Sequence, residues 1–191
     1  MKKIMFNDRY GLTQAVIEGQ KTVTRRIMNR QPDPDDIAYM EPKDYPCQPP
    51  YKVGEIVAVA QCYADIHSEL MIGDFGDDCY DSFKNAVVHD KAGWHNKMFV
   101  QADLMPHQIR ITSVRPERLQ DITDEDCLKE GLEWQHGANM FYVNYNRTNN
   151  SRELLGDTPR EAFASLMDKI SGRGTWERNP FVWRIEFKLV K

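Results

Sequence analysis

Three short apolar stretches, far apart in the sequence, constrain the fold of this chain most strongly. Residues 56–60 form a continuous apolar run of strand length, which is typical of a strand buried on both faces. In residues 109–114 and 181–187, the residues that would face one side of a strand alternate with those that would face the other side, which predicts half-buried strands. Strands therefore dominate the expected fold. This pattern favours a small barrel or a curled sheet with helices at its rim.

Three helices are expected, each marked by a capping side chain before it and a glycine after it. They span about 9–18, 124–130 and 159–171, and the last has Pro159 at its first position. Residues 62–104 lack such a pattern, so we expect an irregular insertion there with one or two hairpins. The polar, asparagine-rich residues 134–155 are expected to form a loop. The prediction is a single α+β domain over residues 1–191.

Composition limits the classes of partner. The chain has 191 residues and a formal net charge of -4, so its overall charge does not favour binding to duplex nucleic acid. The four cysteines include no C-x-x-C pair, and neither a metal nor a cofactor is expected. No apolar run approaches the roughly 20 residues that cross a bilayer, and no signal peptide is evident. We expect a cytoplasmic protein without a membrane partner.

The stretch Gly19-Gln20-Lys21-Thr22-Val23-Thr24-Arg25-Arg26 holds the densest mix of hydroxyls, a candidate base and cations. On a regular strand, Lys21 and Thr24 would face opposite sides because side chains alternate with period two. They can converge only if Lys21 still lies in the turn after Gly19, before the strand begins. In the alternative, this stretch is an ordinary strand with side chains on both faces. Its threonines are then explained by the preference of β-branched residues for strands, and its cations are exposed to solvent.

Several landmarks together resemble the ASCH domain family, whose fold is a PUA-like β-barrel, and in particular its longer phage and prophage members. The resemblance rests on pieces that keep the family's order: 19–26, Tyr51-Lys52-Val53-Gly54-Glu55-Ile56, Met105-Pro106, Arg118-Leu119-Gln120-Asp121-Ile122-Thr123, Glu130-Gly131, Asn179-Pro180-Phe181-Val182-Trp183 and Ile185-Glu186-Phe187. The resemblance implies a PUA-like mixed β-barrel. One departure is Ala60-Gln61-Cys62-Tyr63, where phage-type relatives usually have an Arg-Glu-Thr-Trp-like strand end.

Compact bacterial members of this family include an amidohydrolase that acts on N4-acetylcytidine with a lysine, a threonine and a glutamate. The matching positions here are Lys21, Thr24 and Glu130, with Glu125 and Glu133 close to the last. Amide hydrolysis needs an activated nucleophile and an acid for the leaving nitrogen. Lys21 could act as the base only if its pKa falls well below about 10.4, through burial or neighbouring cations. Glu130 could then protonate the amine if its own pKa is raised.

The expected ligand is a nucleoside or single-stranded RNA or DNA. The candidate ligand-binding residues are Thr22, Arg25, Arg26, Arg110 and Trp176. Trp176 lies among glycines and arginines and could stack on a base, whereas Trp183 is assigned to the core because it lies on an alternating strand. Two alternatives to an enzyme stay open. One is a non-catalytic RNA- or DNA-binding phage accessory module, and the other is a protein-interaction module that uses the insertion.

Overall fold

The computed structural model describes residues 1–33, 35, 40–41, 44–72, 84, 91–146 and 151–190. The chain divides into two compact units. Unit 1 consists of Met1–Phe6, Ile56–Arg110 and Leu189–Lys191, and unit 2 of Asn7–Glu55 and Ile111–Lys188. The long strand β4 (Gln108–Arg118) begins in unit 1 and continues in unit 2.

Unit 1 contains β1 (Lys3–Ile4) and β3 (Ile56–Val59), which pair in parallel with Ile4 opposite Val59. The other side of β3 pairs antiparallel with the first residues of β4, and Val57 lies opposite Ile109. The apolar side chains from Val57 to Ala60 are buried, as the sequence predicts, whereas Ile56 at the start of the strand is exposed.

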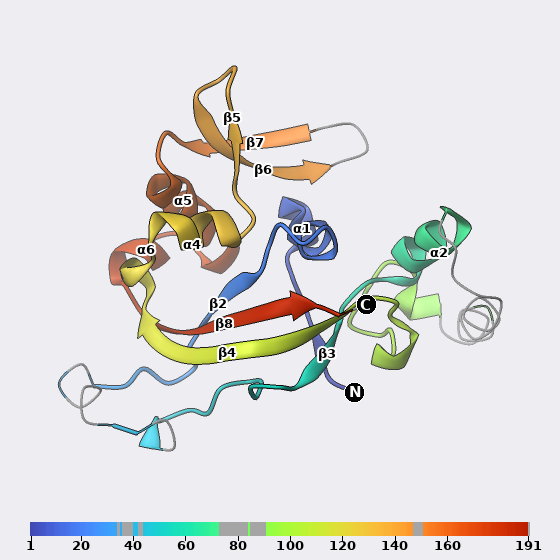
Figure 1. The fold of residues 1–191 in the computed structure, drawn as a ribbon, viewed down its shortest axis with the longest axis horizontal. Helices are drawn as coiled ribbons and strands as arrows, with labels where there is room; N and C mark the ends of the chain where they lie inside the picture. Colours follow the sequence, from blue (N-terminus) through green and yellow to red (C-terminus); the bar gives the residue numbers. More distant parts are fainter. Residues whose placement is uncertain are drawn as a thin grey trace. The chain divides into compact units, whose positions relative to one another are not determined.

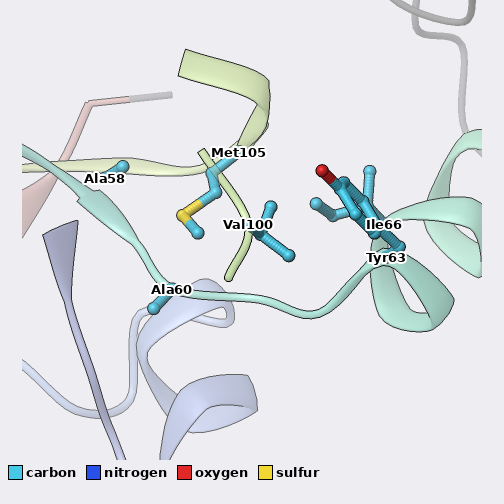
Figure 2. Close-up of a cluster of buried hydrophobic side chains, with 6 residues drawn as sticks. All are labelled: Ala58, Ala60, Tyr63, Ile66, Val100 and Met105. Atoms are coloured by element: carbon cyan, nitrogen blue, oxygen red, sulfur yellow. The ribbon is translucent and has the colours of Figure 1, made fainter. Parts of the chain in front are cut away.

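Helix α2 (Tyr63–Ile72) and the 3-10 helices η3 (Lys91–Trp94) and η4 (Ala102–Leu104) complete unit 1. Figure 2 shows its buried apolar cluster, which gathers side chains from the end of β3, from α2 and from the segment before β4. The cluster consists of Ala58, Ala60, Tyr63, Ile66, Val100 and Met105. The hairpins expected in this region are replaced, in its described part, by α2 and 3-10 turns. Residues 73–83 and 85–90 of the expected insertion lie outside the described residues.

In unit 2, β8 (Phe181–Leu189) lies between β2 (Val23–Ile27) and β4 (Figure 1). Strands β2 and β8 are antiparallel, with Arg25 opposite Arg184 and Thr24 opposite Ile185. The apolar side chains of β8 are buried along most of its length, so the alternation at 181–187 correctly marks a strand.

A second sheet in unit 2 consists of β5 (Glu133–Gln135), β6 (Met140–Asn146) and β7 (Ser151–Gly156), all antiparallel. The prediction of a loop over 134–155 is therefore wrong. Its polar residues hide three buried apolar side chains, those of Tyr142, Val143 and Leu155, which do not form a regular alternation. Helix α5 (Pro159–Ser171) packs against β6 and β7, the strands that carry these side chains.

Besides α5, the helices of unit 2 are η1 (Asp8–Tyr10), α1 (Leu12–Ile17), η5 (Leu119–Asp121), α4 (Asp124–Lys129) and α6 (Thr175–Arg178). The capping signals in the sequence correctly mark α4 and α5, whereas the helix expected over about 9–18 is divided into η1 and α1, and α1 has no side-chain cap. The Thr123 hydroxyl accepts a hydrogen bond from the amide of Asp126 at 3.2 Å, and Thr158 caps α5 in the same way. Both caps satisfy amides that would otherwise lack partners in the first turn.

The mixed α and β content agrees with the predicted fold class. The strand orders are β1-β3-β4 in unit 1, and β4-β8-β2 and β5-β6-β7 in unit 2. Within the described ranges, these sheets are open. None of the described helices is long and apolar enough to cross a lipid bilayer.

Candidate functional site

The turn after α1 decides where the Lys21 side chain begins. Gly19 has a φ of +73°, which only glycine adopts easily, and the amides of Gln20 and Lys21 both donate to the carbonyl of Ala15 at 2.9 Å. Lys21 therefore closes the helix and precedes β2, which starts at Val23. This is the placement that convergence of Lys21 with other site residues requires.

The end of α4 brings Glu130 to the same place. The carbonyl of Lys129 accepts a hydrogen bond from the amide of Thr22 at 2.9 Å, which ties the end of the helix to the start of β2. Gly131 follows with a φ of +100°, a conformation that L side chains rarely adopt. Glycine at this position thus lets the chain turn directly beside Lys21.

Lys21 and Glu130, 109 positions apart in the sequence, form a buried ion pair. The ammonium Nζ of Lys21 donates to Oε2 of Glu130 and, at 2.8 Å, to the Glu130 backbone carbonyl. The two residues are only 2% and 4% exposed. Burial lowers the pKa of the Lys21 amine, and the nearby cations Arg26 and Arg25 lower it further against the opposing pull of Glu130.

Arg25 binds three carboxylates with its guanidinium group. Its Nη1 donates to Oε1 of Glu130 at 3.1 Å, its Nη2 to Asp126 at 2.7 Å and its Nε to Glu117 at 2.7 Å. Each of its nitrogens thus already has an anionic partner inside the protein. The contacts fit a structural cation better than the ligand-binding role expected from sequence.

Asp126 joins Arg25 to the neighbouring strand. Arg184 lies opposite Arg25 in the β2–β8 register, and two like charges at such a position repel. The Asp126 carboxylate separates them, because it accepts from Nε and Nη2 of Arg184 at 2.6 and 3.0 Å and from Arg25. Hydrogen bonds from Arg184, joined by those from Arg25, hold the pKa of Asp126 well below its ordinary value of 3.8.

Thr24 and Arg26 occupy the other face of β2. Side chains alternate along a strand, and cross-strand partners share a face, so Thr24 lies beside Ile185 and Arg26 beside Trp183. Thr24 is buried, and Arg26 is half-buried. Burial lowers the pKa of Arg26, while Tyr51 and Glu130 partly oppose this effect. Lys21 lies two residues before the start of β2 and is paired with Glu130, so the ion pair lies at the head of β2.

The remaining predicted residues have separate surroundings. Thr22 is half-buried, and its backbone links Lys129 to Phe187 through hydrogen bonds of 2.9 and 3.0 Å. Trp176 lies in α6 rather than in an open loop, with the Arg160 guanidinium 5.1 Å above its ring. Arg110 is exposed and belongs to unit 1, whereas the other predicted site residues belong to unit 2.

Sequence reasoning missed the three residues that complete the charge network, namely Glu117, Asp126 and Arg184. For Arg184, a signal was present, because an arginine between the apolar residues of a buried strand needs an anionic partner. For Asp126, the sequence around it indicates only a place in the first turn of a helix, whereas its carboxylate contacts two arginines.

Among the described residues, no group of three His, Cys, Asp or Glu side chains could hold a metal ion. The arrangement instead offers acid–base and electrostatic chemistry, built on a buried amine, a carboxylate and a nearby hydroxyl-bearing strand. Comparisons of the chain with models of protein families, with curated proteins and with solved structures found no match.

Proposed function

We propose that this chain is an ASCH-type protein with a PUA-like barrel fold. It binds a nucleoside or single-stranded nucleic acid and hydrolyses N4-acylated cytidine. The observation that carries the proposal is the buried ion pair between Lys21 and Glu130. The family resemblance predicts that these two residues act together, although 109 positions separate them in the sequence. The surrounding barrel and the expected cytoplasmic location are part of the same proposal.

The proposed reaction uses the ion pair as a carrier of one proton. With the proton on Glu130, Lys21 is a neutral base and Glu130 is an acid. Lys21 removes the hydroxyl proton of Thr24, whose oxygen attacks the acyl carbon. The bond from the acyl carbon to N4 breaks as Glu130 gives its proton to the leaving nitrogen. Lys21 then returns its proton to Glu130, and water hydrolyses the acyl-threonine ester to a carboxylic acid.

The lowered pKa of Lys21 supports its role as the base. A free lysine has a pKa of about 10.4 and is almost fully protonated at neutral pH. Burial at the head of β2 shifts the amine toward its neutral form. Arg25 and Arg26 act in the same direction, so removal of either cation should raise the pKa of Lys21 and leave less of its amine neutral at neutral pH.

The test is release of cytidine from N4-acetylcytidine. We expect turnover by the wild-type protein and by Thr24→Ser, and none by Lys21→Ala, Thr24→Ala or Thr24→Val, since valine keeps the shape of threonine without its hydroxyl. Thr112→Val, on β4, is the matched control and should keep full activity. Circular dichroism of each variant shows whether it has folded. No turnover by folded wild-type protein refutes the enzymatic proposal.

A second candidate is a non-catalytic RNA- or DNA-binding module. It is favoured by one observation: the Glu130 carboxylate receives hydrogen bonds from Lys21 and from Arg25, whereas an acid must hold a proton. This candidate predicts binding to single-stranded RNA that weakens with salt and survives both Lys21→Ala and Thr24→Ala. Binding that either substitution abolishes would count against it.

A further inference from the structure

Trp183 carries a buried donor that the fold does not use. The residue is 3% exposed, and its indole Nε1 is shielded from solvent. Within the described part of the chain, this Nε1 has no hydrogen-bond partner. Buried tryptophans usually pair their N–H group, and an unpaired buried donor costs about 1–3 kcal/mol. Such a group therefore calls for an explanation other than core packing.

The position of Trp183 connects it with the candidate site. In the β2–β8 register it lies opposite Arg26, on the face that also carries Thr24. Arg26 and the indole N–H group are both donors that cannot accept. A Tyr45 ring packs edge-on against the indole, with ring centroids 5.5 Å apart. This face therefore carries the buried indole donor and two aromatic rings near the proposed nucleophile.

We propose that Trp183 is a ligand-binding residue whose indole N–H donates to the ring carbonyl of a bound pyrimidine. The inference rests on the proposed function, because it takes the nucleoside as the ligand. For the base to bind there, it must displace the Tyr45 ring, which packs edge-on against the indole.

The spacing along β2 assigns the ring carbonyl rather than the acyl carbonyl to Trp183. Arg26 and its partner Trp183 lie two residues beyond Thr24, which is roughly 6.6 Å along a strand. The acyl carbon must lie next to the Thr24 hydroxyl for attack. A group bound by Trp183 is therefore on the far side of the same ligand, where cytosine carries its ring carbonyl.

The experiment compares two bases that differ at this carbonyl. Cytosine has it, and 4-aminopyrimidine lacks it, so calorimetric titration of both bases isolates the contact. The wild-type protein should bind cytosine about tenfold more tightly than 4-aminopyrimidine. Trp183→Phe should remove this preference. Trp134→Phe, a change in the other sheet of unit 2, is the matched control and should keep it.

Each outcome decides a different point. Loss of the preference in Trp183→Phe alone supports the inference. An unchanged preference in Trp183→Phe overturns the role of Trp183 and leaves the proposed function standing. Binding of neither base by the wild-type protein overturns both.

Nuclear magnetic resonance of wild-type protein labelled with ¹⁵N-tryptophan tests the same contact if Trp183→Phe does not fold. Of the four indole resonances, one should shift with cytosine and stay in place with 4-aminopyrimidine. Equal shifts with both bases would refute the contact.

Discussion

Asp126→Asn is the substitution that should destabilise the charge network of unit 2 most clearly. The carboxylate accepts three hydrogen bonds, from Arg184 at 2.6 and 3.0 Å and from Arg25 at 2.7 Å. Asparagine has nearly the same volume, but it is neutral, and its amide group can turn a donor toward the guanidinium groups. The substitution leaves two buried arginines facing each other across the β2–β8 pair without the carboxylate that is hydrogen-bonded to both, and Glu117 then remains as an anion near the two guanidinium groups.

The magnitude follows from the burial of this network. Hydrogen bonds to charged groups contribute about 1.5–3 kcal/mol each, and part of this gain offsets the cost of burying the carboxylate. Removal of one partner from a buried ion pair costs about 3–5 kcal/mol in free energy of unfolding. For a chain of this length, that corresponds to a melting temperature lower by roughly 6–20 °C.

Scanning calorimetry of the wild-type protein, Asp126→Asn and Asp124→Asn tests this expectation. Asp124 is an exposed residue in the first turn of the same helix, so its substitution should cost only about 0.3–1 kcal/mol. The pKa of Asp126 is lowered in the folded state, so its contribution is complete above the ordinary value of 3.8 and declines as pH falls below it. The gap between wild type and Asp126→Asn should therefore narrow in acid. A cost no larger than that of Asp124→Asn would refute the reasoning.

Three further predictions concern other parts of the chain. Burial lowers the pKa of Lys21, so the difference in unfolding free energy between the wild type and Lys21→Met should change in favour of the wild type as pH rises from neutral toward 10.5. Denaturation at several pH values measures this difference, and a flat or falling difference would contradict the lowered pKa. Burial raises the pKa of the Cys127 thiol to about 12, so a thiol reagent should modify the half-buried Cys47 well before Cys127 in native protein, and equal rates would contradict this. Thr158→Ala removes the cap of α5 and should cost about 1 kcal/mol in urea denaturation, whereas Thr158→Ser should cost little; equal losses would contradict the capping role.

Local sequence signals predict the helices and strands whose caps and periodic patterns lie within a few neighbouring residues. The strand at 181–187 and the helix after Thr158 were predictable, because alternation, capping and a terminal glycine are encoded within a few residues. The three-stranded sheet over 133–156 was not. Its buried side chains Tyr142, Val143 and Leu155 lie among polar residues without a regular alternation, and α5 packs on β6 and β7. Tertiary packing, rather than local preference, forms that sheet.

The candidate site divides in the same way. A local signal, the cap before the helix, was enough to place Glu130 at the end of that helix. The sequence left open whether Lys21 lies in the turn after Gly19 or on the strand, and the structure places it before β2. The contact between Lys21 and Glu130 came from the family resemblance, since no local rule connects positions 109 residues apart. The contacts of Arg25 with three carboxylates could not be predicted, because its partners Glu117 and Asp126 are brought together only by the fold.

The most direct test of the proposed function is to trap the acyl-enzyme. Wild-type protein mixed with N4-acetylcytidine and quenched in acid within one turnover should carry one acetyl group, and peptide mass spectrometry should locate it on Thr24. Thr24→Val should carry none there. An acetyl group on Lys21, or release of cytidine with no acetylated intermediate, would contradict a mechanism in which the buried Lys21–Glu130 pair activates Thr24.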